Sequence, residues 1–304
     1  MVRIHAASAV LAALALSACS APDPLAGASL QEVNRYFAGT DDLQSKYSRY
    51  ILLDGRELRH GEEFVWNEDG VKIRHATWNA GARDGVWEIW HDDGQPSEKG
   101  EYDNEVAVGM WTRWDDQGRP VSRGGYEAGE QQGEWLEYHQ NGRVSWRRHF
   151  EAGTPVGTWT RYYEDGDMAA SVAYADGMLG GPAALWDDQG QQRVEGSYLR
   201  GMKTGWWISW HANGEKSTEG SFLFDNAQGR WTSWDARGNK TLEGGFAHGD
   251  RDGLWMRWDD RGNVVAKGKF EADRPVGHGS EWDVDAMGEN LAQVYDFTDL
   301  GPKR

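Results

Sequence analysis

The feature that most constrains the fold of this sequence is a glycine that recurs every 24 residues without a slip. Strict self-similarity at a period between about 20 and 50 residues is typical of repeat architectures. We therefore predict a tandem array of one structural unit, and we number each unit from this register glycine as position 0. The register glycines are Gly61, Gly85, Gly109, Gly133, Gly157, Gly181, Gly205, Gly229, Gly253 and Gly277.

Most units carry aromatic residues at positions 2, 5 and 17 and a second glycine at position 9. In the unit that begins at Gly109, these residues are Trp111, Trp114, Tyr126 and Gly118. Short runs rich in Trp, Tyr and Thr between Gly- and Asp-bearing turns predict strands, and no run keeps the apolar spacing of a helix. The predicted fold is all-β: an elongated single-sheet antiparallel β-meander solenoid of about ten 24-residue hairpin repeats.

The aromatic rings are the predicted core, because a lone hairpin is marginal in water and must stack on its neighbours. Positions 2 and 5 have opposite parity, so either both faces carry rings or a bulge brings the second ring round. The bulge is the favoured prediction. The alternative to a purely structural role is that some rings stay exposed and stack on sugars or cations. The candidate ladder residues are Trp87, Trp90, Trp111, Trp114, Trp135, Trp159, Trp207, Trp210, Trp231, Trp234, Trp255 and Trp258.

The pattern Gly-x-Trp-x-x-Trp/Tyr-x-x-x-Gly, followed by Gly-x-Tyr/Phe, resembles the MORN repeat, and more closely the variant found in YwqK-type antitoxins. The resemblance extends from Gly61 to Trp282. It implies an interaction scaffold, of an antitoxin or immunity-like kind. Two units depart from the pattern: one has Ala183 in place of the position 2 Trp, and the unit at Gly277 reads as a terminal cap.

The first residues read as a targeting segment. A short apolar run, residues 6–16, ends at Leu-Ser-Ala-Cys, which resembles the lipobox of bacterial lipoproteins. The resemblance implies that residues 1–18 are a lipoprotein signal peptide and that Cys19 carries the lipid that anchors the chain to a membrane. Ser20 after the cysteine implies the outer membrane of the cell envelope, with the protein facing the periplasm. The alternative is an ordinary secretory signal with an incidental cysteine.

The remaining segments are assigned by composition and motif. Residues 19–28 are a predicted tether, and residues 29–60 a predicted N-terminal cap with a degenerate hairpin. Ser29 heads a capping-box pattern, which predicts a short helix from Leu30 to Ala38. Residues 61–282 are the MORN-like repeats, and residues 283–304 a predicted C-terminal cap and tail.

The charge balance restricts the partners. The formal net charge is −17, with 49 acidic and 32 basic residues, which disfavours nucleic acid and anionic lipid surfaces. The acidic surface favours solubility, or alternatively a basic protein partner. Because Cys19 is the sole cysteine, disulfides and thiolate metal sites are excluded.

No catalytic constellation stands out. Paired acids recur in the turns, but a calcium loop needs six to eight oxygens at set positions, so we interpret the pairs as turn residues. The pairs are Asp92-Asp93, Asp115-Asp116, Asp187-Asp188 and Asp259-Asp260. His91, His139 and His211 share position 6, a predicted solvent-side turn slot. We therefore predict no enzyme activity, no metal and no cofactor.

The sequence predicts an envelope-anchored repeat scaffold that binds another protein. One alternative is an aromatic module that binds glycan or cell wall, suggested by the 18 tryptophans. The other is a passive structural spacer.

Overall fold

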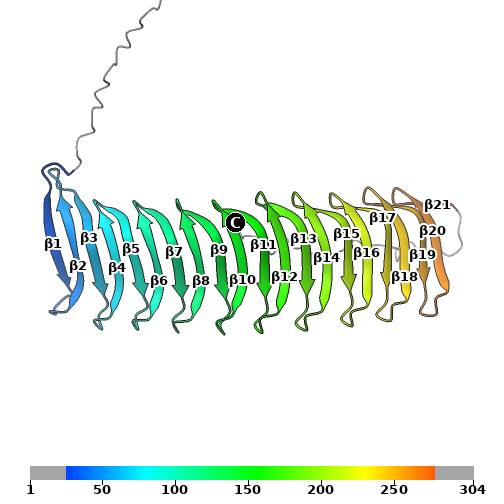
Figure 1. The fold of residues 1–304 in the computed structure, drawn as a ribbon, viewed down its shortest axis with the longest axis horizontal. Coiled ribbons are helices and arrows are strands. Elements are labelled where there is room, and N and C mark those ends of the chain that lie inside the picture. Colours follow the sequence, from blue (N-terminus) through cyan, green and yellow to red (C-terminus); the bar gives the residue numbers. More distant parts are fainter. Residues whose placement is uncertain (1–24, 278–304) are drawn as a thin grey trace, which may run out of the picture.

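The computed structural model describes residues 25–277, which form one open sheet of 21 strands. Each strand pairs antiparallel with the strand before it and the strand after it, so the sheet is a meander. The predicted all-β meander is confirmed, and Figure 1 shows it as a long ribbon. The strands are β1 (Ser29–Tyr36), β2 (Leu43–Ile51), β3 (Glu57–Trp66), β4 (Lys72–Asn79), β5 (Ala82–Trp90), β6 (Pro96–Asp103), β7 (Val106–Trp114), β8 (Pro120–Glu127), β9 (Glu130–Tyr138), β10 (Val144–Glu151), β11 (Thr154–Tyr162), β12 (Met168–Ala175), β13 (Met178–Trp186), β14 (Gln192–Leu199), β15 (Met202–Trp210), β16 (Lys216–Leu223), β17 (Asn226–Trp234), β18 (Lys240–Ala247), β19 (Asp250–Trp258), β20 (Val264–Glu271) and β21 (Arg274–Val276).

Two-residue turns connect each even-numbered strand, from β4 onward, to the next odd-numbered strand. Both turn residues have positive φ, as Ala128 (φ 51°) and Gly129 (φ 83°) do between β8 and β9. This conformation matches the right-handed twist of the flanking strands. Positions 19 and 20, which form these turns, are not restricted to glycine, because Asn104 and Glu105 adopt the same conformation.

The register glycine lies at a bulge. In the ladder between β6 and β7, Lys99 pairs with Thr112 and Glu101 pairs with Val108, so three residues of β7 stand opposite Gly100. Gly109 is one of the three and has φ 68°, a left-handed conformation that glycine adopts without steric cost. The recurrent glycine is therefore explained by a bulge that bends every odd-numbered strand from β5 to β19.

The prediction that a bulge brings the position 5 ring round to join the position 2 ring is wrong. The pairing of β7 with β8 does shift between Arg113 and Trp114, but the extra residue, Val121, lies on β8, so the alternation along β7 is kept. The bulge at the register glycine precedes both rings in the strand and so leaves their relative parity unchanged. In the first unit the rings at positions 3 and 5, Phe64 and Trp66, contact each other, which places position 5 on the face opposite position 2. Both faces therefore carry aromatics. We call the face with positions 2 and 17 the ladder face and the other the opposite face.

The predicted helix from Leu30 to Ala38 is also wrong, because this segment contains strand β1. Strand β1 pairs with β2 along its length, from Ser29 opposite Ile51 to Tyr36 opposite Leu43. A helix of about nine residues is marginal on its own, whereas an edge strand gains a full ladder of backbone hydrogen bonds. The end of the sheet is thus capped by a hairpin of the same architecture.

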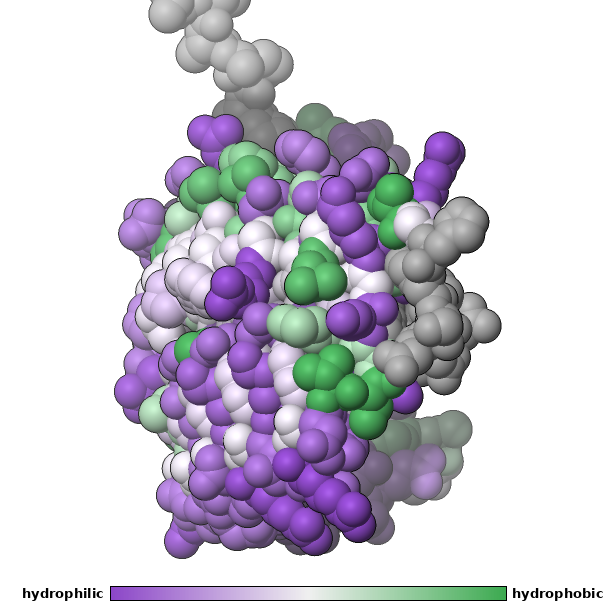
Figure 2. Space-filling model, turned by 90° about the vertical axis from the view of Figure 1, so that its right-hand side faces the viewer, coloured by the Kyte–Doolittle hydropathy of each residue, from purple (hydrophilic) through white to green (hydrophobic). Residues whose placement is uncertain are grey.

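The C-terminal end of the ribbon is amphipathic. Figure 2 views this end, and its hydrophobic side chains form small separate groups among hydrophilic ones. Exposed apolar residues of the last strands include Leu254, Val264 and Val265. Residues 278–304, on which the predicted C-terminal cap falls, lie outside the described residues.

Candidate functional site

The ladder face holds a row of alternating rings that serves as the core of this one-layer sheet. Most position 2 Trp rings meet a position 17 ring on either side: Trp111 lies 5.1 Å from Tyr102 and 5.9 Å from Tyr126, both nearly edge-on. Such edge-to-face pairs add about 0.5–1.5 kcal/mol beyond area burial. The candidate ladder residues placed in this row are Trp87, Trp111, Trp135, Trp159, Trp207, Trp231 and Trp255.

A glycine at position 15 of the preceding unit makes room for five of the indoles. Trp111 covers Gly100 so closely that a Cβ there would fall well under 3.0 Å from the ring. The indole N–H of Trp135 donates to the carbonyl of Gly125 at 3.0 Å, so the buried polar atom is satisfied. The same glycine–tryptophan fit recurs at Gly124, Gly196, Gly220 and Gly244.

The departure at Ala183 is compensated across the sheet. Ala183 occupies position 2, and the residue paired with it, at position 15 of the preceding unit, is Val172 instead of glycine. Both side chains are buried. Part of the side-chain volume that Trp supplies in other units is supplied here by the valine on the neighbouring strand, so the ladder face of the irregular unit is still filled.

The candidate residues at position 5 lie on the opposite face and do not join the ladder. They are half-buried, and some rest beside a lysine of the preceding unit, as Trp90 does 4.2 Å from the Nζ of Lys72. Phe64 and Trp66, at positions 3 and 5 of one unit, contact each other on this face. The candidate residues placed here are Trp90, Trp114, Trp210, Trp234 and Trp258.

Cations at position 22 rest on the ladder rings of the next unit. The guanidinium of Arg83 lies 4.0 Å from the Tyr102 centroid and 5.6 Å from that of Trp87. Glu105, at position 20, holds it with an ion pair of 2.7 Å, and these contacts lower the pKa of that carboxyl, the hydrogen bond from Arg83 most of all. Two further cations repeat the arrangement: Lys203 over Trp207 and Phe222, and Arg251 over Phe270, with Asp225 and Asp273 at position 20.

A hollow of about 400 Å³ lies at one of the places where this arrangement is missing. Here position 22 of one unit is Ala107 and position 20 of the next unit is Gly129, so both the cation and its acidic partner are replaced by small residues. The floor and walls are aromatic, with Trp111 and Tyr126 among them. At the rim, Glu98 lies 3.1 Å from Arg113 in an ion pair. Sequence analysis missed this site, although the substitutions at positions 20 and 22 could have indicated it.

A buried carboxylate closes the ladder at its N-terminal end, and sequence analysis missed it too. Glu63 takes position 2, where later units have Trp, and is 1% exposed. It forms ion pairs with Arg59 and with Arg74, the latter at 3.1 Å, and accepts a hydrogen bond from the indole of Trp78 at 3.1 Å. Burial of an ion needs this degree of pairing.

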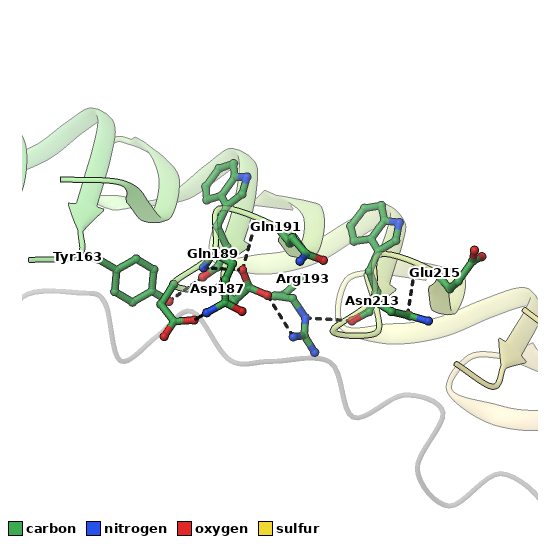
Figure 3. Close-up of polar contacts among 10 residues, drawn as sticks. Tyr163, Asp187, Gln189, Gln191, Arg193, Asn213 and Glu215 are labelled. Carbon is green, nitrogen blue, oxygen red and sulfur yellow. Dashed lines mark hydrogen bonds and ion pairs between the residues drawn. The ribbon is translucent and has the colours of Figure 1, made fainter. Parts of the chain in front are cut away.

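The position 6 residues stabilise the second kind of turn in two ways. An aspartate accepts from its own turn: Asp187 receives the backbone N–H groups of Gln189 and Gln191. A histidine or tyrosine instead reaches the next unit, as the Tyr163 hydroxyl donates to the carbonyl of Trp186 at 2.7 Å. Figure 3 shows both along one edge of the sheet. His91, His139 and His211 also bond to the next unit, through the carbonyls of Trp114, Tyr162 and Trp234.

The acidic pairs behave as turn residues in the described part of the chain. Asp115 and Asp259, like Asp187, accept backbone hydrogen bonds within their turns. Within residues 25–277, no three His, Cys, Asp or Glu side chains are grouped so that they could hold a metal ion. The same residues contain no helix with the length and apolarity needed to cross a bilayer.

Comparisons with known proteins identify the repeat. A family described as "MORN repeat variant" matches residues 83–104, which span most of one period of the register, so the chain carries MORN-type repeats. A search of curated proteins found no match. Among solved structures, a chain of the crystal structure of TcdB2-TccC3-Cdc42 is 10% identical, with a TM-score of 0.18. The alignment covers 74% of this chain and 17% of that one, and at this TM-score the likeness carries no argument.

Proposed function

We propose that this chain is an envelope-anchored repeat scaffold that binds another protein along its ladder face. The observation that carries the proposal is the hollow of about 400 Å³ between β6 and β9, where Tyr102, Tyr126 and Trp135 remain half-buried. Aromatic residues in partly open pockets are typical anchors of protein interfaces. The repetition of one unit in a rigid sheet provides the extended surface that such scaffolds use.

The partner is a basic protein in this proposal. The chain has a net charge of −17, and charge of one sign speeds association with a partner of the other. An antitoxin or immunity-like role is one form of this function, in which the bound partner is a toxin and binding blocks its activity. A neighbouring toxin gene whose product is neutralised by this chain is the observation that would support that form.

Anchoring through a lipid on Cys19 is also a proposal, because residues 1–24 lie outside the described residues. It rests on the lipobox-like residues 16–19. The variant Cys19→Ser should move the protein from the membrane fraction to the soluble fraction and abolish incorporation of labelled palmitate. Continued acylation of the variant would contradict the anchor and leave the scaffold proposal standing.

Two deletions of equal length test the scaffold and locate its binding region. One removes residues 85–132 and the other residues 205–252; each is two 24-residue units and keeps the register. The full chain is captured from the envelope with its partner, and the partner is then purified and its affinity measured by calorimetry. We expect the deletion of 85–132 to abolish binding, because it removes the hollow, and the deletion of 205–252 to leave binding nearly unchanged.

The two deletion variants control for each other, since a sum of nearest-neighbour contacts gives both similar stability. Equal, undiminished function of both variants in cells would favour the passive spacer. The absence of any protein that binds the purified full chain would refute the scaffold.

Glycan binding is a second candidate, favoured by one residue. Trp206, at position 1, is 62% exposed, and an exposed indole is a platform for stacking. Peptidoglycan fragments should then shift the tryptophan fluorescence of the full chain, and Trp206→Ala should remove that shift. A fluorescence spectrum that stays constant over a wide range of fragment concentrations would eliminate this candidate.

A further inference from the structure

The repeat provides its own comparison for the hollow beside Ala107. Position 22 pairs across the strands with position 17 of the same unit, as Trp78 does with Arg83 and Tyr102 with Ala107. The Arg83 and Ala107 side chains therefore leave the ladder face at equivalent points. Arg83 reaches the rings of the next unit, whereas the Ala107 methyl is too short to do so. The rings beside Ala107 therefore have the same arrangement without a cation over them; we call such a ring pair that can hold a cation a seat.

The acidic residue changes together with the cation. Position 20 is acidic beside Arg83, Lys203 and Arg251, and it is Gly129 beside Ala107. The charged pair is thus absent as a whole beside the hollow, as it also is at Ala227 and Gly249.

The aromatic surroundings suit a cation. Trp111 is the floor and Tyr126 a perpendicular wall, 5.9 Å away and at 82°, so a group above Trp111 meets one ring by its face. Trp gives the strongest attraction to a cation among the side chains, and the attraction increases when the cation is desolvated. The carboxylate that lines the hollow is Glu98, which is paired with Arg113 at the rim.

We propose that the hollow beside Ala107 receives an arginine or lysine side chain of a basic protein partner. The incoming cation takes the place over Trp111 and Tyr126 that the chain's own Arg83, Lys203 and Arg251 take in their units. The inference deepens the proposed scaffold function and rests on it, since it names the chemical group by which the partner is recognised. Three equivalent places are filled by the chain's own cations, whereas other units have Gln131, Pro155, Leu179 and Ala227 at position 22.

Argininamide is the probe, and its neutral isostere citrullinamide the control ligand. The full chain is labelled with 5-fluorotryptophan, and fluorine NMR follows Trp111 and Trp135 during titration. We expect argininamide to shift these two signals with saturation and citrullinamide to leave them in place. Equal shifts with both ligands would overturn the assignment, because the site would then not select the charge.

Two variants fill and open seats. Ala107→Arg with Gly129→Glu reproduces the Arg83–Glu105 pair and should weaken argininamide binding by at least about tenfold. Gly129 has φ 83°, close to the φ of 70° that Glu105 adopts, so the turn accepts the change. Arg83→Ala with Glu105→Gly should open a second seat, seen as new saturable shifts of Trp87. No second seat in this variant would contradict the comparison on which the proposal stands.

The matched control is Gln131→Arg with Gly153→Glu, the same charge change at positions 22 and 20 of the next unit. It should leave argininamide affinity within about twofold of the wild-type value, and circular dichroism should show all variants folded. In partner binding, the filled variant should lose at least about tenfold in affinity while the control keeps it. Unchanged partner affinity of the filled variant would overturn this inference and leave the scaffold intact, whereas the absence of any partner would refute the scaffold itself.

Discussion

Trp111 lies flat across Gly100, and the two residues fit because one has the largest side chain and the other has none. A Cβ on residue 100 would fall well under 3.0 Å from the indole, so no relaxed rotamer accommodates both. The equivalent pair in another unit, Val172 opposite Ala183, solves the same problem with two side chains of intermediate size.

The combination of a valine and an alanine should also be tolerated at residues 100 and 111. We expect Gly100→Val to cost about 1–3 kcal/mol of unfolding free energy through overpacking, and Trp111→Ala about 3–5 kcal/mol through the cavity it leaves. The double variant should cost less than the sum by at least about 1 kcal/mol, because each change relieves the other. Urea unfolding of all four proteins gives the coupling energy.

A nearby substitution away from this pair separates packing from general damage. Glu101→Ala, at an exposed position of β6 on the opposite face, should change stability by less than about 0.5 kcal/mol. Strict additivity of the Gly100 and Trp111 variants would show that the two residues do not share one space.

The fold could be predicted because its signal is repeated in every unit. Turn glycines and aromatic runs at a fixed spacing define the hairpins, and the register fixes their order. The parity of Trp111 and Trp114 indicated opposite faces, and the favoured bulge was wrong because it assumed that every ring belongs to one layer, whereas both faces of the sheet carry rings. The segment from Leu30 was misassigned because its capping-box pattern is local, and the pairing with β2 that outweighs it is not.

The candidate site was harder to predict, because its parts belong to different units. In the sequence, Ala107 and Gly129 are two ordinary small residues. Only the strand pairing shows that they occupy the places that Arg83 and Glu105 occupy in another unit. Glu63 was missed for the same reason. Its partner Arg59 precedes the bulge in β3, and its partner Arg74 comes from the neighbouring strand β4.

Glu63 should be essential to the N-terminal end of the ladder. We expect Glu63→Ala to destabilise the protein by about 3 kcal/mol, somewhat less than for a fully buried pair, since Arg59 and Arg74 are partly exposed. Its removal leaves two guanidiniums facing each other and the Trp78 indole without its acceptor. Thermal unfolding measures the loss. Glu62→Ala, an exposed neighbour on the opposite face, is the control and should have little effect; equal losses for both would contradict a special role for the buried carboxylate.

Acid should weaken the turns that aspartates hold. Hydrogen bonds from the Asn263 side chain and backbone lower the pKa of Asp259 below its ordinary value, and Asp235 is lowered in the same way by Asn239. The folded chain then binds fewer protons than the unfolded chain, so this stability is complete above about pH 5 and decreases as the pH falls through the lowered pKa values. Urea unfolding at pH 7 and at about pH 3.5 should show the decrease.

The variant Asp259→Asn keeps an oxygen acceptor but cannot be protonated in this range. It should be less stable than the wild type at pH 7 and should lose less stability on acidification. A wild-type and variant pair with parallel pH profiles would show that this carboxylate does not contribute to acid sensitivity.

The turn with Asp at position 6 and the turn with His at position 6 should be interchangeable only when positions 6 and 8 are changed together. Where position 6 is His211, position 8 is Asn213, whose side chain accepts the backbone N–H of Glu215; where position 6 is Asp235, position 8 is Arg237, which cannot accept. Asp235→His therefore leaves the turn amides without an acceptor and should cost about 1–2 kcal/mol. Adding Arg237→Asn restores the acceptor and should recover most of this loss, which urea unfolding can measure. Arg237→Asn alone should be nearly neutral, because Asp235 still holds the turn, and a double variant no more stable than Asp235→His would refute the pairing of positions 6 and 8.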